Sequence, residues 1–170
     1  MDRARARVPC GPGGEIRDYV GFYFGPRSPM LYRIHTGWGV KRVDQSAIAY
    51  LVSSAQVVAS AGLRFVFTDR HSLARVASFS DRLDQLGIVD FDVAYAEQWS
   101  TTPEYPDRQE KKQAEFLVHG AMPWPLVGEI GVLNQKASDR VRAILAAYPD
   151  RHRPRVFCEP SWYYRRGRLP

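Results

Sequence analysis

The sequence predicts an α+β fold built on a largely antiparallel sheet. Short apolar runs typical of strands are mixed irregularly with segments of helical spacing, without the strict strand–helix–strand alternation of a parallel α/β protein. No internal repeat or low-complexity segment is present. A chain of 170 residues with 45% hydrophobic side chains can bury a substantial core, so we expect residues 1–170 to form a single domain.

The expected strands are runs of β-branched and aromatic residues that end at glycine, proline or polar residues. In chain order they cover residues 19–24, 30–34, 48–52, 64–68, 88–91, 111–119, 130–133 and 155–158. Aromatic side chains are dense in the first two, which a Gly-Pro turn separates. This pair of strands suits either the wall of a pocket or ordinary hydrophobic core.

Helices are expected where a capping side chain precedes apolar residues at helical spacing. A Ser-Ser pair should cap a short helix over 55–61, which Gly62 ends. Asp69 is placed to cap a second helix over 72–79. A longer helix is expected over 138–148, where Val, Ile, Leu and Tyr side chains recur on one face.

The chain carries a net charge of +6, and arginines gather at both of its ends. Such a charge favours a polyanionic partner, because arginines that neutralise phosphates release counterions. An arginine-rich composition unrelated to nucleic acid explains the charge equally well. Charge alone therefore leaves both interpretations open.

Several classes of protein are disfavoured by what the sequence lacks. Cys10 and Cys158 form neither a disulfide framework nor a metal-ligand pattern, so we expect a reducing, cytoplasmic setting and no metal. No run is apolar over the length that a bilayer requires, and the first residues lack the apolar core of a signal peptide. Walker A, GxGxxG, HExxH, CxxC and GxSxG motifs are missing, which argues against P-loop NTPases, Rossmann dehydrogenases and zinc hydrolases.

Residues 111–119 are the most informative stretch. Their alternation predicts a strand after a basic start, and Glu115 is a carboxylate among largely apolar neighbours. Burying a carboxylate is costly unless it is paired, so Glu115 should face a cleft or carry a function. The alternative is an edge-strand glutamate that faces solvent.

Short blocks of this sequence occur in the same order in one known family. They are Asp18-Tyr19-Val20, Phe22-Tyr23-Phe24, Ser28-Pro29-Met30-Leu31, His35 with Gly37, Lys41-Arg42, Leu51-Val52-Ser53-Ser54, Phe65-Val66-Phe67-Thr68-Asp69, His71, Gln113-Ala114-Glu115 and Trp162-Tyr163. In these blocks the chain resembles the DarT toxins, DNA ADP-ribosyltransferases that use NAD to modify a base in single-stranded DNA. Each block is weak by itself, but together they run along nearly the whole chain.

The resemblance implies an ADP-ribosyltransferase-like fold, with a split, largely antiparallel β-sheet, flanking helices and NAD as the substrate. It implies that Glu115 is the catalytic glutamate. Its carboxylate would accept a hydrogen bond from the nicotinamide ribose and favour the positive charge that develops as nicotinamide leaves. A catalytic arginine is also implied near the acceptor base, and by position it is Arg3, with Arg5 as the second choice.

The same resemblance implies the binding residues and the partners. Tyr23 and Met30 would line the pocket for the nicotinamide and its ribose. The residues expected to hold the DNA strand are His71, Lys111, Lys112 and Arg5. Single-stranded DNA presents unstacked bases without the cost of opening a duplex. The second implied partner is a macrodomain antitoxin that reverses the modification.

One departure from the family pattern leaves two functions open. Family members carry a further segment ahead of this start, including a His-x-Thr element that binds NAD, so either the sequence starts too late in its gene or the protein is truncated. The leading hypothesis is a toxin that transfers ADP-ribose to a base, thymine, in single-stranded DNA. The alternative is a catalytically silent remnant that binds single-stranded nucleic acid or an antitoxin. A basic structural domain without a ligand is a third interpretation.

Overall fold

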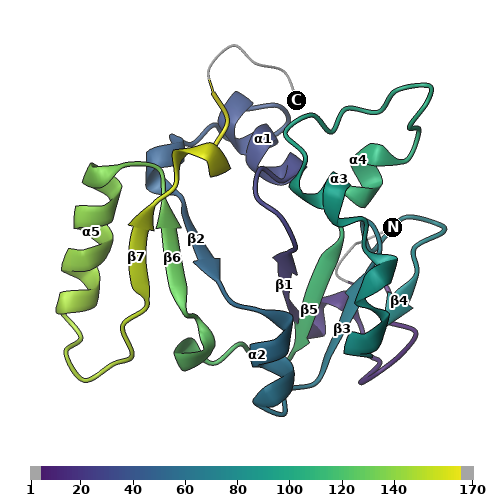
Figure 1. Cartoon of the computed structure of the whole chain (residues 1–170), viewed down its shortest axis with the longest axis horizontal. Coiled ribbons are helices and arrows are strands. Elements are labelled where there is room, and N and C mark those ends of the chain that lie inside the picture. The colour runs from purple at the N-terminus through teal and green to yellow at the C-terminus, as the bar shows by residue number, and fades with distance from the viewer. Residues whose placement is uncertain (1–4, 166–170) are drawn as a thin grey trace. The chain divides into compact units, whose positions relative to one another are not determined.

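The computed structural model describes residues 5–165, which fold as two compact units (Figure 1). The first unit contains residues 5–29 and 55–122, and the second contains residues 30–54 and 123–165. Each unit is therefore assembled from stretches that are far apart in the sequence.

Within residues 5–165, the first unit is organised on a four-stranded sheet whose neighbouring strands are all antiparallel. In spatial order the strands are β1 (Tyr19–Tyr23), β5 (Glu115–His119), β3 (Phe65–Thr68) and β4 (Phe79–Ser80). The α-helices of this unit are α2 (Ala55–Ser60), α3 (Phe91–Tyr95) and α4 (Arg108–Lys111). Short 3-10 helices occur at Ile16–Asp18 and Leu83–Ile88. Because β5 lies between β1 and β3, both of its edges are hydrogen-bonded.

Apolar side chains cover both faces of this sheet. The buried residues on one face are Val58, Phe65, Phe67, Val89, Ala114, Phe116 and Val118. Those on the opposite face are Ala6, Val8, Ile16, Val66 and Leu117. Glu115 and Leu117 are two residues apart on one strand, so they point to the same face. The Glu115 face is thus the one covered by the amino-terminal segment.

The described part of the second unit holds a three-stranded sheet. Its strands are β2 (Ala49–Val52), β6 (Glu129–Val132) and β7 (Arg155–Cys158); β6 pairs antiparallel with β2 and parallel with β7. Helix α1 (Pro29–Thr36) begins at the boundary of this unit, and α5 (Gln135–Ala146) packs on the sheet. Short 3-10 helices occur at Gln45–Ala47, Trp124–Leu126 and Pro160–Trp162.

Most of the expected elements are confirmed. The strands expected over 19–24, 48–52, 64–68, 130–133 and 155–158 correspond to β1, β2, β3, β6 and β7, and the helix expected over 55–61 is α2. Helix α5 begins earlier than expected because Asn134, and not Ser138, caps it by accepting the N–H of Ala137 at 3.0 Å. The strand expected over 111–119 is shorter, because Lys111 still belongs to α4 and β5 begins at Glu115.

The strand expected over residues 30–34 is wrong, because these residues lie in α1. Pro29 is the first residue of that helix, where its missing N–H costs nothing. The helix ends at Gly37, which has φ +81° and so adopts a conformation that favours glycine. Pro29 therefore starts a helix here, although it can equally well end an extended segment.

The helix expected over residues 72–79 is also wrong. The carboxylate of Asp69 accepts the N–H of Ser78 at 2.8 Å and closes a loop that leads into β4. An aspartate can satisfy a turn as well as a helix start, so its presence alone does not distinguish the two. Residues 88–91 are likewise not extended throughout, because Asp90 caps α3 by accepting the N–H of Val93 at 3.1 Å.

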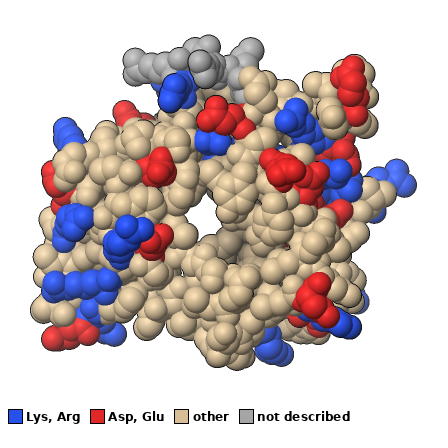
Figure 2. Space-filling view, in the orientation of Figure 1, with Lys and Arg blue, Asp and Glu red and all other residues tan. Residues whose placement is uncertain are grey.

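Charged side chains of both signs are interspersed over α5 and β7 of the second unit on the face shown in Figure 2. Arg155 of β7, for example, pairs with Glu129 of β6. The excess positive charge of the chain therefore does not form a surface of one sign on that face. None of the helices formed by residues 5–165 has both the length and the apolar character needed to cross a membrane.

Candidate active site

Glu115 is the first residue of β5 and is almost completely buried, with 2% of its surface exposed. Its strand is central in the sheet, and Tyr23 of β1 is its cross-strand partner. The alternative of an edge-strand glutamate that faces solvent is therefore wrong. A carboxylate buried this deeply requires polar partners.

The end of β3 and the turn after it supply such partners. The hydroxyl of Thr68 accepts the backbone N–H of Glu115 at 3.1 Å and donates to the carbonyl of Arg70 at 2.7 Å. The backbone N–H of Ser72 donates to Oε2 of the Glu115 carboxylate at 3.3 Å. Glu115 is thus held both through its backbone and through its side chain.

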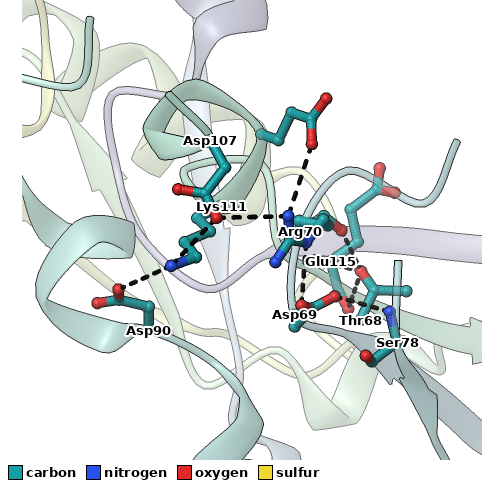
Figure 3. A network of polar contacts seen from close by, with 9 residues as sticks. Thr68, Asp69, Arg70, Ser78, Asp90, Asp107, Lys111 and Glu115 are labelled. Carbon is teal, nitrogen blue, oxygen red and sulfur yellow. Dashed lines mark hydrogen bonds and ion pairs between the residues drawn. The ribbon is translucent and has the colours of Figure 1, made fainter. Parts of the chain in front are cut away.

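Arg70 joins the turn after β3 to α4 through a group of carboxylates (Figure 3). Its guanidinium lies 3.0 Å from Asp69, 3.4 Å from Asp107 and 3.7 Å from Glu110. Burial opposes its charge, but the hydrogen bond to Asp69 and the neighbouring carboxylates outweigh burial and raise the pKa of Arg70. Arg70 is therefore a charged link inside the first unit.

Lys111 extends this network toward α3 (Figure 3). Its ammonium lies 3.3 Å from Asp107 and 3.8 Å from Asp90, the residue that caps α3. Asp107 therefore pairs with both Arg70 and Lys111. Because two carboxylates already neutralise it, Lys111 offers less free positive charge to DNA than an unpaired lysine would.

Lys112 is buried, with 2% of its surface exposed, and its Nζ donates to the carbonyl oxygens of Ala94 at 2.7 Å and Ala96 at 2.9 Å. Burial, and to a lesser extent the charge of Arg27, lowers the pKa of Lys112 to about 7. The expected contact of Lys112 with DNA therefore disagrees with its position, which is inside the first unit.

Tyr23 is the cross-strand partner of Glu115, and His71 lies in the turn whose Ser72 N–H binds the Glu115 carboxylate. His71 precedes Ser72 in the turn, donates its N–H to the carbonyl of Glu110 at 2.9 Å and is half-buried. Its ring Nδ1 accepts the N–H of Leu73 at 3.1 Å, which places the proton of the neutral ring on Nε2. Tyr23 is half-buried opposite Glu115.

Of the remaining expected site residues, Arg5 and Met30 are described by the structure and Arg3 is not. Arg5 is exposed and adjoins Ala6, which belongs to the buried cluster on the Glu115 face. Met30 is on α1 and is 52% exposed. Arg3 lies outside the residues that the structure describes.

Sequence reasoning missed the residues that hold Glu115. For Thr68 the sequence offers one signal, a hydroxyl residue at the end of a strongly apolar run. The structure shows that Thr68 is fully buried. Ser72 and Arg70 carried no signal, because their roles depend on a turn that brings them to residues far along the chain, Glu115 for Ser72 and Asp107 for Arg70. Among residues 5–165, no group of three or more His, Cys, Asp or Glu side chains is arranged to hold a metal ion.

A fixed, buried carboxylate of this kind can stabilise positive charge on a bound substrate. Comparison with known proteins agrees with that chemistry. A DNA ADP-ribosyl transferase of Thermus sp. (strain 2.9) is 49% identical over 162 residues, which are 95% of this chain and 76% of the relative. One of Escherichia coli O127:H6 (strain E2348/69 / EPEC) is 39% identical over 129 residues, which are 75% of this chain and 59% of the relative.

Solved structures are similar as well. The structure of Thermus sp. 2.9 DarT in complex with NAD+ matches with a TM-score of 0.89 at 48% identity, over 95% of this chain and 80% of that one. The structure of Thermosipho africanus DarTG in complex with ADP-ribose matches with a TM-score of 0.71 at 14% identity, over 95% of this chain and 39% of that one, which shows a shared fold. The family described as "ssDNA thymidine ADP-ribosyltransferase, DarT" matches residues 1–164. The chain therefore belongs to the DarT family of DNA ADP-ribosyltransferases.

Proposed function

We propose that this chain transfers ADP-ribose from NAD to a thymine base of single-stranded DNA, with Glu115 as the catalytic carboxylate. The observation that carries the proposal is the buried Glu115 carboxylate, which the N–H of Ser72 holds at the start of a central strand. A charge fixed in this way stabilises a developing positive charge without first having to reorganise.

The reaction exchanges one bond at the anomeric carbon of the nicotinamide ribose. The C–N bond to nicotinamide breaks and neutral nicotinamide leaves, a C–N bond to the ring nitrogen of thymine forms, and that nitrogen releases its proton to solvent. Positive charge develops on the ribose as nicotinamide leaves, and the Glu115 carboxylate stabilises it as in glycoside cleavage. Tyr23, the cross-strand partner of Glu115, is proposed as a wall of the NAD pocket, and Met30 remains a proposed NAD contact.

The acceptor nitrogen needs help because it is a poor nucleophile while it carries its proton. A guanidinium near the base would polarise the N–H bond and favour the deprotonated form. Arg3 and Arg5 are proposed for this role. The position of Ala6 in the cluster on the Glu115 face supports Arg5, because it places the adjoining backbone over that face.

We propose that His71 and residues 100–111 bind the DNA strand. Tyr105 is 60% exposed, and the guanidinium of Arg108 lies 5.7 Å from the centre of its ring. An exposed aromatic ring beside a cation can stack with an unpaired base and attract a neighbouring phosphate. Lys112 is left out of this set because its ammonium is bound inside the first unit.

We also propose that the chain acts in the cytoplasm as the toxin of a toxin–antitoxin system. A base that carries ADP-ribose presents a bulky, charged group in place of its pairing edge, so a cell that tolerates this enzyme must remove the group. A macrodomain that hydrolyses the new bond is the proposed partner. Release of ADP-ribose from modified oligonucleotide by such a partner, and rescue of growth on its co-expression, would test this.

Incubation with labelled NAD and single-stranded oligonucleotides of defined base composition tests the transfer itself. The wild type should label oligonucleotides that contain thymine and leave those without it unlabelled. Glu115→Gln keeps the size and removes the charge, so labelling should fall on the order of 100-fold or more. Glu129→Gln, at a surface carboxylate paired with Arg155, is the matched control and should label like the wild type. DNA binding without labelling by the wild type would contradict the transferase and favour the binding remnant.

A further inference from the structure

The hydroxyl of Ser72 is a buried polar group without a hydrogen-bond partner among residues 5–165. Ser72 is 7% exposed, and its backbone N–H is the group that binds Oε2 of Glu115 at 3.3 Å. The hydroxyl oxygen is only three covalent bonds from that nitrogen. It therefore lies beside the proposed catalytic carboxylate.

Such a hydroxyl is unusual because burial removes its hydrogen bonds to water and the fold has replaced none of them. Neighbouring hydroxyls are satisfied. Thr68 binds both the N–H of Glu115 and the carbonyl of Arg70, and Ser80 donates to Gln85 at 2.6 Å. An unpaired buried group in a native protein calls for an explanation, and a partner supplied by a bound substrate at a catalytic site is one of them.

We propose that Ser72 is a further catalytic residue, whose hydroxyl hydrogen-bonds the same ribose hydroxyl of NAD that Glu115 binds. An ionised carboxylate can only accept, so Glu115 takes the ribose O–H as a donor. The ribose oxygen then has free lone pairs, to which the Ser72 O–H would donate. Together the two side chains would fix both the direction of the ribose O–H and the position of the anomeric carbon. This inference rests on the proposed function.

The test compares Ser72→Ala with Ser80→Ala, a matched change at a buried serine whose hydroxyl is paired. Ser80 is 5% exposed, and its hydroxyl also accepts the N–H of Arg82 at 3.1 Å. In urea unfolding without NAD, Ser72→Ala should be as stable as the wild type or more stable, because no bond is lost. Ser80→Ala should be less stable, because its partners are left unpaired.

The effects on activity should be the reverse of those on stability, with Ser72→Ala impaired and Ser80→Ala unaffected. With saturating oligonucleotide, kcat/KM for NAD should fall roughly three- to tenfold in Ser72→Ala, the value expected for one hydrogen bond between neutral groups. Ser80→Ala, assayed well below its unfolding transition, should keep the kcat/KM of the wild type. Loss of kcat/KM for NAD together with unimpaired stability is a combination that a structural serine does not produce.

Each other outcome identifies what fails. A loss of stability in Ser72→Ala would mean that the hydroxyl already has a partner, such as a buried water, and would refute the role of Ser72. Unchanged kcat/KM for NAD in a variant that transfers normally would refute Ser72 alone and leave the transferase intact. If the wild type neither binds NAD, measured by calorimetry, nor transfers ADP-ribose, the proposed function fails and the contact fails with it.

Discussion

The Nζ atom of Lys112 donates a hydrogen bond to the carbonyl oxygen of Ala94 at 2.7 Å. A second bond reaches the carbonyl of Ala96 at 2.9 Å, and Arg27 donates to the carbonyl between them, that of Tyr95, at 3.1 Å. The last carbonyls of a helix have no helical partner, so the donors of these two side chains complete the end of α3. Lys112 thereby ties α3 to the chain shortly before Glu115.

Lys112 should make the stability of the protein rise with pH above neutrality. Burial lowers its pKa from the ordinary 10.5 to about 7 in the folded state. Between these two values the unfolded chain binds a proton that the folded chain does not, so the free energy of unfolding increases with pH. A neutral amine keeps two N–H donors, enough for both carbonyls.

Urea unfolding of the wild type and of Lys112→Met at several pH values isolates this contribution, because the other titrating groups are common to both. The difference in unfolding free energy, wild type minus variant, should grow steadily from pH 7 toward pH 10. A difference that is flat or that shrinks over this range would contradict the buried, neutral lysine.

Gly25→Ala should destabilise the protein strongly. A Cβ at this position would lie 2.0 Å from the carbonyl oxygen of Ala94, which is backbone and already fixed by Lys112. Overpacking of this kind typically costs about 1–3 kcal/mol or more. Gly87→Ala is the control, because its Cβ would meet nothing within 4 Å, and it should be neutral or stabilising by up to about 1 kcal/mol. Thermal unfolding of both variants measures the contrast, and equal melting temperatures would count against the close approach of Gly25 to Ala94.

Thr68→Val should lower both stability and activity. Valine has the shape of threonine but leaves the N–H of Glu115 and the carbonyl of Arg70 unpaired, which costs about 1–3 kcal/mol for a buried group. Glu115 would then lose its backbone anchor, and transfer should fall as well. Thr68→Ser keeps the hydroxyl and should restore most of both properties. Urea unfolding and the oligonucleotide-labelling assay measure stability and activity in both variants. A valine variant as stable as the wild type would show that the hydrogen bonds of the Thr68 hydroxyl contribute nothing to stability.

Arg5→Ala should weaken binding of single-stranded DNA more than Lys111→Ala. Arg5 is exposed and adjoins Ala6 on the Glu115 face, where the strand is proposed to bind. The ammonium of Lys111 is shared between Asp107 and Asp90, so removing it takes less net positive charge from the proposed DNA-binding surface. Each phosphate contact removed should reduce the slope of log affinity against log salt by about 0.7. Fluorescence anisotropy with a labelled oligonucleotide, without NAD and over a range of salt, compares the two variants. A larger effect in Lys111→Ala would show that its ion pairs open on DNA binding.

Strands were easier to predict than the segments between them. Phe65–Thr68 and Glu129–Val132 are short, apolar and flanked by turn residues, and each packs in its sheet as the pattern indicates. The start of α1 and the loop after Asp69 were predicted wrongly, because proline and aspartate each satisfy more than one local structure. Where local propensity allows both a helix and a turn or extended segment, tertiary packing decides which one forms.

The sequence by itself determined the mixed α+β class, most of the strands and the importance of Glu115. A carboxylate in an apolar strand stands out because burying it is costly unless it is paired. Only the tertiary structure decided that Lys112 is internal and that the hydroxyl of Ser72 is unpaired beside Glu115. The physical reason is that the partners of Lys112 and Glu115 are backbone groups of distant segments. Every residue carries the same backbone groups, so no sequence pattern marks the ones that folding brings to a particular side chain.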